Sequence, residues 1–159
     1  DYFAGRLGLD RIQPFLTGNP AQETEAGWGL GRIGYLDHTC DLETLARTVK
    51  KRLGQTHIRV TGAMRMAVCC AAVCTGSGGS LVPDFIGSDA DVFISGDIKY
   101  HEARMVEEAG KAVIDVGHFG SEQMAVDLLA DLLCDAMAEP GSAVEIIKYM
   151  DEKDPFTIV

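Results

Sequence analysis

Residues 114–122, with the sequence IDVGHFGSE, place an imidazole and a carboxylate where an apolar, strand-like run gives way to a helical pattern. The strand ends of open α/β sheets are where such folds bind ligands. If Gly120 and Ser121 open the helix, His118 and Glu122 converge on one point beside its first turn. An imidazole nitrogen with a carboxylate oxygen suits zinc, manganese or ferrous iron. A structural explanation fits the pair equally, because Glu122 favours a helix N-terminus and His118 can cap a strand.

The composition of the whole chain is that of one globular domain. Of its 159 residues, 47% are hydrophobic and 24% are charged, which is enough apolar material for a core. The chain starts with Asp1, and no signal-like segment follows, so we expect a fragment or processed piece of a longer product. No apolar run approaches the roughly 20 residues that span a bilayer, so we expect a soluble protein without membrane contact.

Charge and cysteine content exclude some partners and favour a compartment. The net charge is −10, with 24 acidic and 14 basic residues, and the basic residues are scattered. No basic stripe is available for a phosphate backbone, so nucleic-acid binding is not expected. The five cysteines are an odd number, which fits a reducing cytosol and a cytoplasmic protein. Cys70 and Cys74 would lie about 13 Å apart on a strand, too far to share one zinc ion, and we interpret them as buried small hydrophobes.

Strand and helix patterns alternate along the chain. We expect strands at 31–36, 58–60, 66–73, 91–95, 112–116 and 144–147. We expect helices at 2–9, 42–53, 100–109 and 121–138, with a short helical piece from residue 81. Asp41 is the expected N-cap of the helix at 42–53, and Gly54 its end. This alternation predicts an α/β fold, with a mostly parallel or mixed sheet, helices on its faces and right-handed crossovers.

Two further segments have special features. Residues 17–27 are rich in Gly, Asn, Pro and acidic residues, which predicts a linker. The helix at 121–138 carries an apolar stripe that we expect to face the core. The stripe consists of Met124, Leu128, Leu129, Leu132 and Leu133.

A glycine-rich loop follows the strand at 66–73. Backbone N–H groups of Gly76, Ser77, Gly78 and Gly79 could form a nest for a phosphate or carboxylate. The loop lacks the Lys-Ser/Thr of a P-loop and does not have the spacing of G-x-G-x-x-G. A tight structural turn explains these glycines equally well.

A third candidate site lies at residues 95–101. Asp97 is placed to be the N-cap of the following helix, whereas His101 has no evident structural task and could transfer protons or support a ligand. Three consecutive strands thus end in special residues, and a parallel sheet would bring those ends to one edge. His38 and His57 lack such a context, and we expect them on the surface or in loops.

Together, residues 73–80, 90–101 and 115–122 closely resemble the NGG-one-interacting-factor-three-like family, also known as GTP cyclohydrolase I type 2 homologues. Residues 29–34 are similar to the segment that opens the family's C-terminal half, and the likeness runs from about residue 27 to the end. The resemblance implies half of a duplicated fold in which two α/β halves enclose a di-metal centre, commonly in toroidal hexamers. We expect one domain without a PII-like insert, with residues 1–26 as N-terminal helix and linker and 27–159 as core.

The resemblance also implies a site and a chemistry. It maps two metal ligands onto His118 and Glu122, while the family's other ligands, a His pair and an Asp, belong to the N-terminal half. Thr75 departs from the Gly of most members. The implied activity is metal-assisted hydrolysis of a nucleotide or other phosphate-containing substrate by two divalent ions (Zn, Mn or Fe). Asp97 and His101 are candidate catalytic residues, with His101 shuttling a proton, and the glycine loop would hold the substrate's anionic group.

Two other functions remain open. The chain could belong to a non-enzymatic metal-binding or regulatory scaffold, in which homo-oligomer formation and partner contact are the main role. It could also be a small-ligand sensor that uses the glycine loop alone. Because two of five expected protein ligands are present, we expect little or no activity from this chain by itself.

Overall fold

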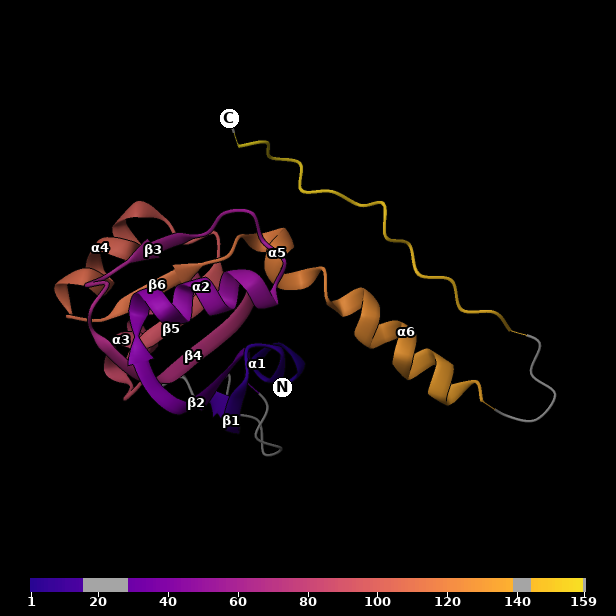
Figure 1. Ribbon diagram of the computed structural model, residues 1–159, viewed down its shortest axis with the longest axis horizontal. Coiled ribbons are helices and arrows are strands. Elements are labelled where there is room, and N and C mark those ends of the chain that lie inside the picture. Colours follow the sequence, from indigo (N-terminus) through magenta and orange to yellow (C-terminus); the bar gives the residue numbers. More distant parts are fainter. Residues whose placement is uncertain (16–28, 139–143, 159) are drawn as a thin grey trace.

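The computed structural model describes residues 1–15, 29–138 and 144–158, so the linker expected at 17–27 lies outside the described residues. Its centre is a six-stranded sheet in the order β1-β2-β4-β5-β6-β3 (Figure 1). The strands are β1 (Leu9–Phe15), β2 (Gly31–Asp41), β3 (Arg59–Thr61), β4 (Ala67–Ser77), β5 (Val92–Gly96) and β6 (Ala112–Asp115). The helices are α1 (Tyr2–Arg6), α2 (Leu42–Arg52), α3 (Val82–Gly87), α4 (Tyr100–Glu108), α5 (His118–Glu122) and α6 (Ala125–Ala136), with a 3-10 turn at Gly79–Leu81.

The fold is of the mixed α/β class, as the sequence predicts. Strands β4, β5 and β6 are parallel neighbours, whereas β1, β2 and β3 join the sheet antiparallel. All residues of β5 are buried, because helices cover both faces of a parallel sheet centre. Successive strand residues point to opposite faces, so Val92 and Ile94 pack in the cluster that contains α1 and α2 residues, and Phe93 packs in the cluster of α3 and α4.

Helix α2 forms where its sequence signals predict. The Asp41 side chain accepts a hydrogen bond of 2.8 Å from the Thr44 N–H, which satisfies a donor that the first turn leaves free. Leu45 and Val49 are buried on the helix face that meets the sheet. Gly54 ends the helix with φ +65°, a left-handed conformation that glycine adopts without strain.

The N-terminal segment contains a strand that the sequence pattern did not predict. Helix α1 ends at Arg6, and β1 then pairs with β2 along one edge of the sheet. The ends of β1 are buried while Asp10 and Arg11 are exposed, so the strand lacks the regular apolar alternation of a half-buried strand. Pro14 is tolerated because an edge strand leaves one row of backbone groups unpaired.

The C-terminal segment differs most from expectation. The helix expected at 121–138 is divided into α5 and α6, and residues 144–147 form no strand in the described part of the chain. The stripe on α6 does not face the core, because Leu129, Leu132 and Leu133 are 57%, 55% and 49% exposed. Of the predicted stripe, Met124 packs against the core of the sheet domain, and Leu128 is half-buried. The prediction of a strand at 144–147 is therefore wrong, and so is the prediction that the stripe on α6 faces the core.

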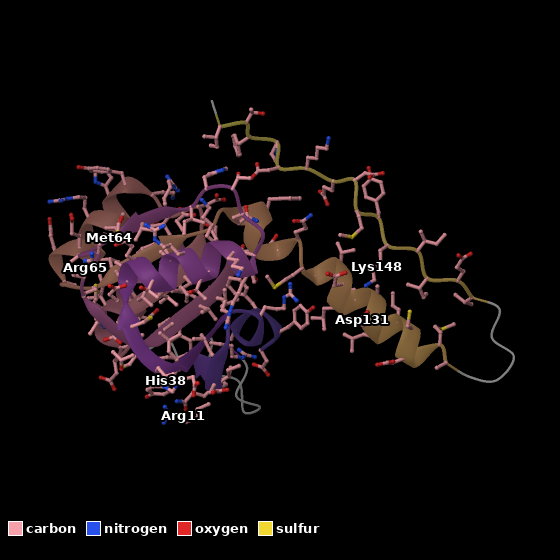
Figure 2. The ribbon with its side chains drawn as sticks, in the orientation of Figure 1. Arg11, His38, Met64, Arg65, Asp131 and Lys148 are labelled. Carbon is pink, nitrogen blue, oxygen red and sulfur yellow. The ribbon has the colours of Figure 1, made fainter. Side chains whose placement is uncertain are left out.

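Helix α6 projects from the sheet, and residues 144–158 run back alongside it (Figure 1). Lys148 bridges the two, with its Nζ 3.1 Å from Asp127 and 3.4 Å from Asp131 (Figure 2). We call α6 and residues 144–158 the arm, and residues 1–15 with 29–124 the sheet domain.

In the described part of the chain, no helix combines the length and the apolar character needed to cross a membrane.

Candidate metal site

The C-terminal ends of β4, β5 and β6 meet at one edge of the sheet, because these three strands are parallel neighbours. The Ser95 hydroxyl donates a hydrogen bond of 3.3 Å to the Gly76 carbonyl, which joins the ends of β5 and β4. A Cβ on Gly96 would lie 2.6 Å from the carbonyl group of Gly117, so the ends of β5 and β6 touch backbone to backbone. The expected convergence of the three strand ends is confirmed.

His118 and Glu122 face each other at this edge. Helix α5 begins at His118 and not at Gly120 or Ser121 as expected, because Gly117 turns the chain with φ +78°. His118 and Glu122 are thus the first and fifth residues of one short helix, and Nε2 of the imidazole lies 3.3 Å from Oε2 of the carboxylate. Both side chains are 51% exposed, so an ion or ligand can reach them.

Ser121 fixes α5 against the glycine loop. Its hydroxyl accepts a hydrogen bond of 2.8 Å from the Gly76 N–H and donates one of 2.8 Å to the His118 carbonyl. Ser121 is fully buried, so these bonds compete little with water. The helix that carries His118 and Glu122 is therefore held directly on the end of β4.

Asp97 contacts the other nitrogen of the His118 ring. Its Oδ2 lies 2.8 Å from Nδ1, and this hydrogen bond, aided by the charge of Glu122, raises the pKa of His118. A neutral His118 that donates Nδ1–H to Asp97 keeps the lone pair of Nε2 on the side of Glu122. The expected N-cap role of Asp97 is wrong, because Lys99 occupies that position and its N–H donates to Glu102.

Gly76 leaves the space that the site occupies. A Cβ at this position would lie 2.5 Å from Oε1 of Glu122 and 3.2 Å from Nε2 of His118. Gly76 also has φ +63°, a left-handed conformation that side chains disfavour. Both the space and the backbone geometry therefore require glycine here.

The rest of the glycine loop packs closely on its neighbours. A Cβ on Gly78 would overlap Phe93 and Ser95, and a Cβ on Gly79 would lie 2.5 Å from the Glu102 carboxylate. Ser77 is exposed. The loop's face toward α4 thus carries a negative charge, while its face toward α5 borders the site. Anion binding by this loop stays a prediction.

The site opens into a cleft of about 1410 Å³ between the sheet domain and residues 152–158. Asp97, His118 and Glu122 all line the cleft, and His57 and Arg59 stand in its wall. No sequence pattern indicated a site role for His57, because its position depends on the turn between α2 and β3. His101 is not among the lining residues and lies exposed on α4, edge-on to Tyr100.

The described residues supply part of a metal-binding shell. In residues 1–15, 29–138 and 144–158, no three His, Cys, Asp or Glu side chains are grouped so that they could hold a metal ion. His118 and Glu122 are two potential ligands, and Asp97 supports the first of them. All five cysteines are free, with Cys70 buried as expected and Cys74 half-buried.

Comparisons with known proteins identify relatives over nearly the whole chain. The profile of the Duf34/NIF3 (NGG1p interacting factor 3) family matches residues 1–155. A GTP cyclohydrolase 1 type 2 homolog of Streptococcus pneumoniae is 30% identical, over 98% of this chain and 57% of the relative. The match covers between 34% and 57% of the length of these curated relatives.

Solved structures show the same fold. A hypothetical protein of Staphylococcus aureus matches with a TM-score of 0.84 and 22% identity, over 99% of this chain and 62% of the other. A Bacillus cereus protein related to NIF3 matches with a TM-score of 0.71 and 31% identity, over 82% of this chain and 36% of the other.

Proposed function

This chain belongs to the Duf34/NIF3 family, and from that membership we propose that it supplies His118 and Glu122 to the metal centre of a hydrolase. The substrate would carry a nucleotide or phosphate group, in line with the name GTP cyclohydrolase 1 type 2 homolog borne by its relatives. The metal would be a divalent zinc, manganese or iron ion, because imidazole and carboxylate ligands suit these ions.

The space kept open by Gly76 carries this proposal. His118 Nε2 and Glu122 Oε2 lie 3.3 Å apart in that space, so a donor nitrogen and a donor oxygen face one point. Metal-binding histidines usually hold a carboxylate or carbonyl on their second ring nitrogen, and Asp97 occupies that position here. A purely structural ion pair between His118 and Glu122 would not require the support that Asp97 gives to the second ring nitrogen.

Each residue of the site has a role in the proposed chemistry. Asp97 fixes the tautomer and orientation of His118, and Ser121 holds α5 on the glycine loop. Arg59 stands in the cleft wall, where its guanidinium pairs with the buried carboxylate of Asp115. A bound divalent ion would polarise the substrate and lower the pKa of a coordinated water. A proton-transfer role for His101 would require this residue to reach the substrate from outside the cleft lining.

The remaining parts of the proposal concern the complete protein. Two side chains cannot hold two ions tightly, so the other ligands would come from polypeptide outside this segment, which is where the longer relatives have additional chain. The complete protein would form a homo-oligomer, with a hexamer as the expected form. It would act in the cytoplasm, since all five cysteines are unpaired.

Elemental analysis and turnover assays test the proposal. The samples are a family-length protein that contains this segment, its variants His118→Ala and Glu122→Gln, and the control His38→Ala. His38 is exposed on β2, on the side of the molecule away from α5 (Figure 2). We expect about two ions per chain in the parent and in the control, and a loss of metal in both site variants. Hydrolysis of GTP or simple phosphoesters with added manganese or zinc should follow the same pattern. Unchanged metal content in His118→Ala would contradict the assignment.

The exposed apolar arm favours a second candidate function, a metal-binding scaffold whose main role is contact with other subunits. Leu129, Leu132 and Leu133 on α6 and Phe156 in the tail are all exposed, and soluble proteins seldom leave such a surface without a partner. This candidate predicts bound metal without turnover in the same assays. It also predicts that Leu129→Ser with Leu132→Ser disrupts assembly while metal content is retained.

A further inference from the structure

The carboxylate of Asp115 is the most buried charge beside the site, and it contacts neither His118 nor Glu122 in the described hydrogen bonds and ion pairs. Asp115 ends β6 and is 5% exposed. Its Oδ2 accepts a hydrogen bond of 3.0 Å from the Ile98 N–H, and its Oδ1 accepts one of 2.9 Å from the Gly117 N–H. Arg59 on β3 pairs with the same carboxylate. One side chain thus joins the loop after β5, the loop after β6 and strand β3.

The two backbone groups held by Asp115 are adjacent to the site residues. Ile98 follows Asp97 directly, and Gly117 precedes His118 directly. Asp97 has φ +53° and Gly117 has φ +78°, so each loop makes its turn in the left-handed region. For Asp97 this conformation costs energy and persists only when surrounding bonds enforce it. The bond from Ile98 to Asp115 is positioned to do so.

The two loops also have no room to adjust separately. A Cβ on Gly96 would lie 2.7 Å from the His118 backbone nitrogen, so the backbones are already in contact. Arg59 donates a second hydrogen bond of 3.1 Å to the Ile98 carbonyl, which fixes the same peptide segment from its other side. A change at Asp115 would therefore be transmitted to the 2.8 Å contact between Asp97 and His118.

We propose that Asp115 is a positioning residue for the candidate metal site. Because it accepts hydrogen bonds from both loops, it holds Asp97 and His118 in a fixed relative position. Arg59 supports it by balancing the buried charge, because a buried carboxylate without a partner is strongly unfavourable. Asp115 is not itself a candidate metal ligand, because its two oxygens already accept hydrogen bonds from Ile98, Gly117 and Arg59. The metal-affinity part of this inference rests on the proposed function, whereas the orientation of His118 does not.

Asp115→Asn tests the proposal in the 159-residue chain, because asparagine keeps the size but cannot accept from two N–H groups and an arginine in the same way. The first readout is the ¹⁵N-edited NMR signature of the His118 imidazole without metal, in mildly alkaline buffer. The second is titration with Zn²⁺ alone, in a family-length protein that contains this segment and so supplies the remaining ligands. Val92→Ala is the control, since Val92 is fully buried at the opposite end of β5 and its truncation weakens the fold without touching the site. Arg59→Gln is a milder second variant, which keeps both backbone bonds to Asp115.

We expect Asp115→Asn to move His118 from one tautomer toward a mixture and to weaken Zn²⁺ binding about tenfold, as loss of a supporting contact does at metal sites. Arg59→Gln should show a smaller change in the same direction, and Val92→Ala neither change. The proposal is overturned if Asp115→Asn lowers Tm as Val92→Ala does but leaves the His118 signature unchanged. If Asp115→Asn fails to fold, an unchanged His118 signature in Arg59→Gln overturns it instead. A tautomer change in Asp115→Asn, together with a family-length protein that binds no Zn²⁺ even before mutation, supports the positioning role and contradicts the proposed function.

Discussion

The sheet domain and the arm contain similar apolar helical patterns but bury them differently. Helix α2 packs Leu45 and Val49 against the sheet, and both are almost fully buried. Helix α6 has an equally clear stripe, yet Leu132 and Leu133 are about half exposed. A repeat of apolar residues thus predicts a helix, whereas its burial depends on whether a second surface lies opposite.

The largest expected effect comes from the same substitution in both regions. Leu45→Ala should lower the free energy of unfolding by about 2–5 kcal/mol, because it removes a buried side chain and leaves a cavity. Leu132→Ala should change it by less than about 0.5 kcal/mol, since its side chain is exposed. Urea denaturation of both variants measures the difference. Equal losses would mean that the arm is packed as tightly as the sheet domain.

The next effect compares two left-handed glycines within the sheet domain. Gly76 and Gly54 have φ values of +63° and +65°, so alanine at either position should cost about 1–2 kcal/mol of stability. A Cβ meets Glu122 and His118 only at Gly76, because nothing lies within 4 Å of the position at Gly54. In a family-length protein that contains this segment, Gly76→Ala should therefore also abolish Zn²⁺ binding, measured by titration, while Gly54→Ala retains it. Retained binding in Gly76→Ala would show that the space beside α5 is not needed for metal.

The smallest expected effect is a difference in alkylation rate between two cysteines, and measuring it leaves the fold intact. Burial raises the pKa of Cys70 to about 11, and the nearby Asp91 adds to this. Cys134 lies exposed on α6. Because the thiolate is the reactive form, iodoacetamide should label Cys134 in neutral buffer and leave Cys70 unmodified. Labelling of Cys70 should increase as the pH rises toward about 11. Mass spectrometry of digested samples gives both rates, and early modification of Cys70 would show that β4 is open to solvent.

Sequence patterns predicted the sheet domain well where the signals are local. The N-cap at Asp41 and the stop at Gly54 gave the limits of α2, since both act within one turn. It was also predictable that the ends of β4, β5 and β6 meet at one edge of the sheet, because alternating strands and helices favour parallel neighbouring strands. Strand β1 was missed because its pattern of exposure is irregular, and an edge strand is stabilised mainly by the neighbour with which it pairs.

Site residues were partly predictable for the same reason. The spacing of His118 and Glu122 was sufficient to bring them together on one helix, whatever its first residue. The partner of His118 was not predictable, because Asp97 comes from another loop and reaches it through a left-handed turn. The roles of Gly76 and Asp115 depend on contacts between strands that are distant in sequence.

By itself, the sequence determined the α/β class, most of the helices and strands, and the pairing of His118 with Glu122, because these follow from hydrophobic periodicity and short spacings. Tertiary structure alone decided that Asp97 faces the imidazole, that Asp115 joins two loops and that the stripe on α6 faces solvent. Each of these depends on which surface lies opposite a given side chain. Hydrophobic periodicity is a property of a single segment, whereas burial and site geometry depend on how at least two segments contact each other.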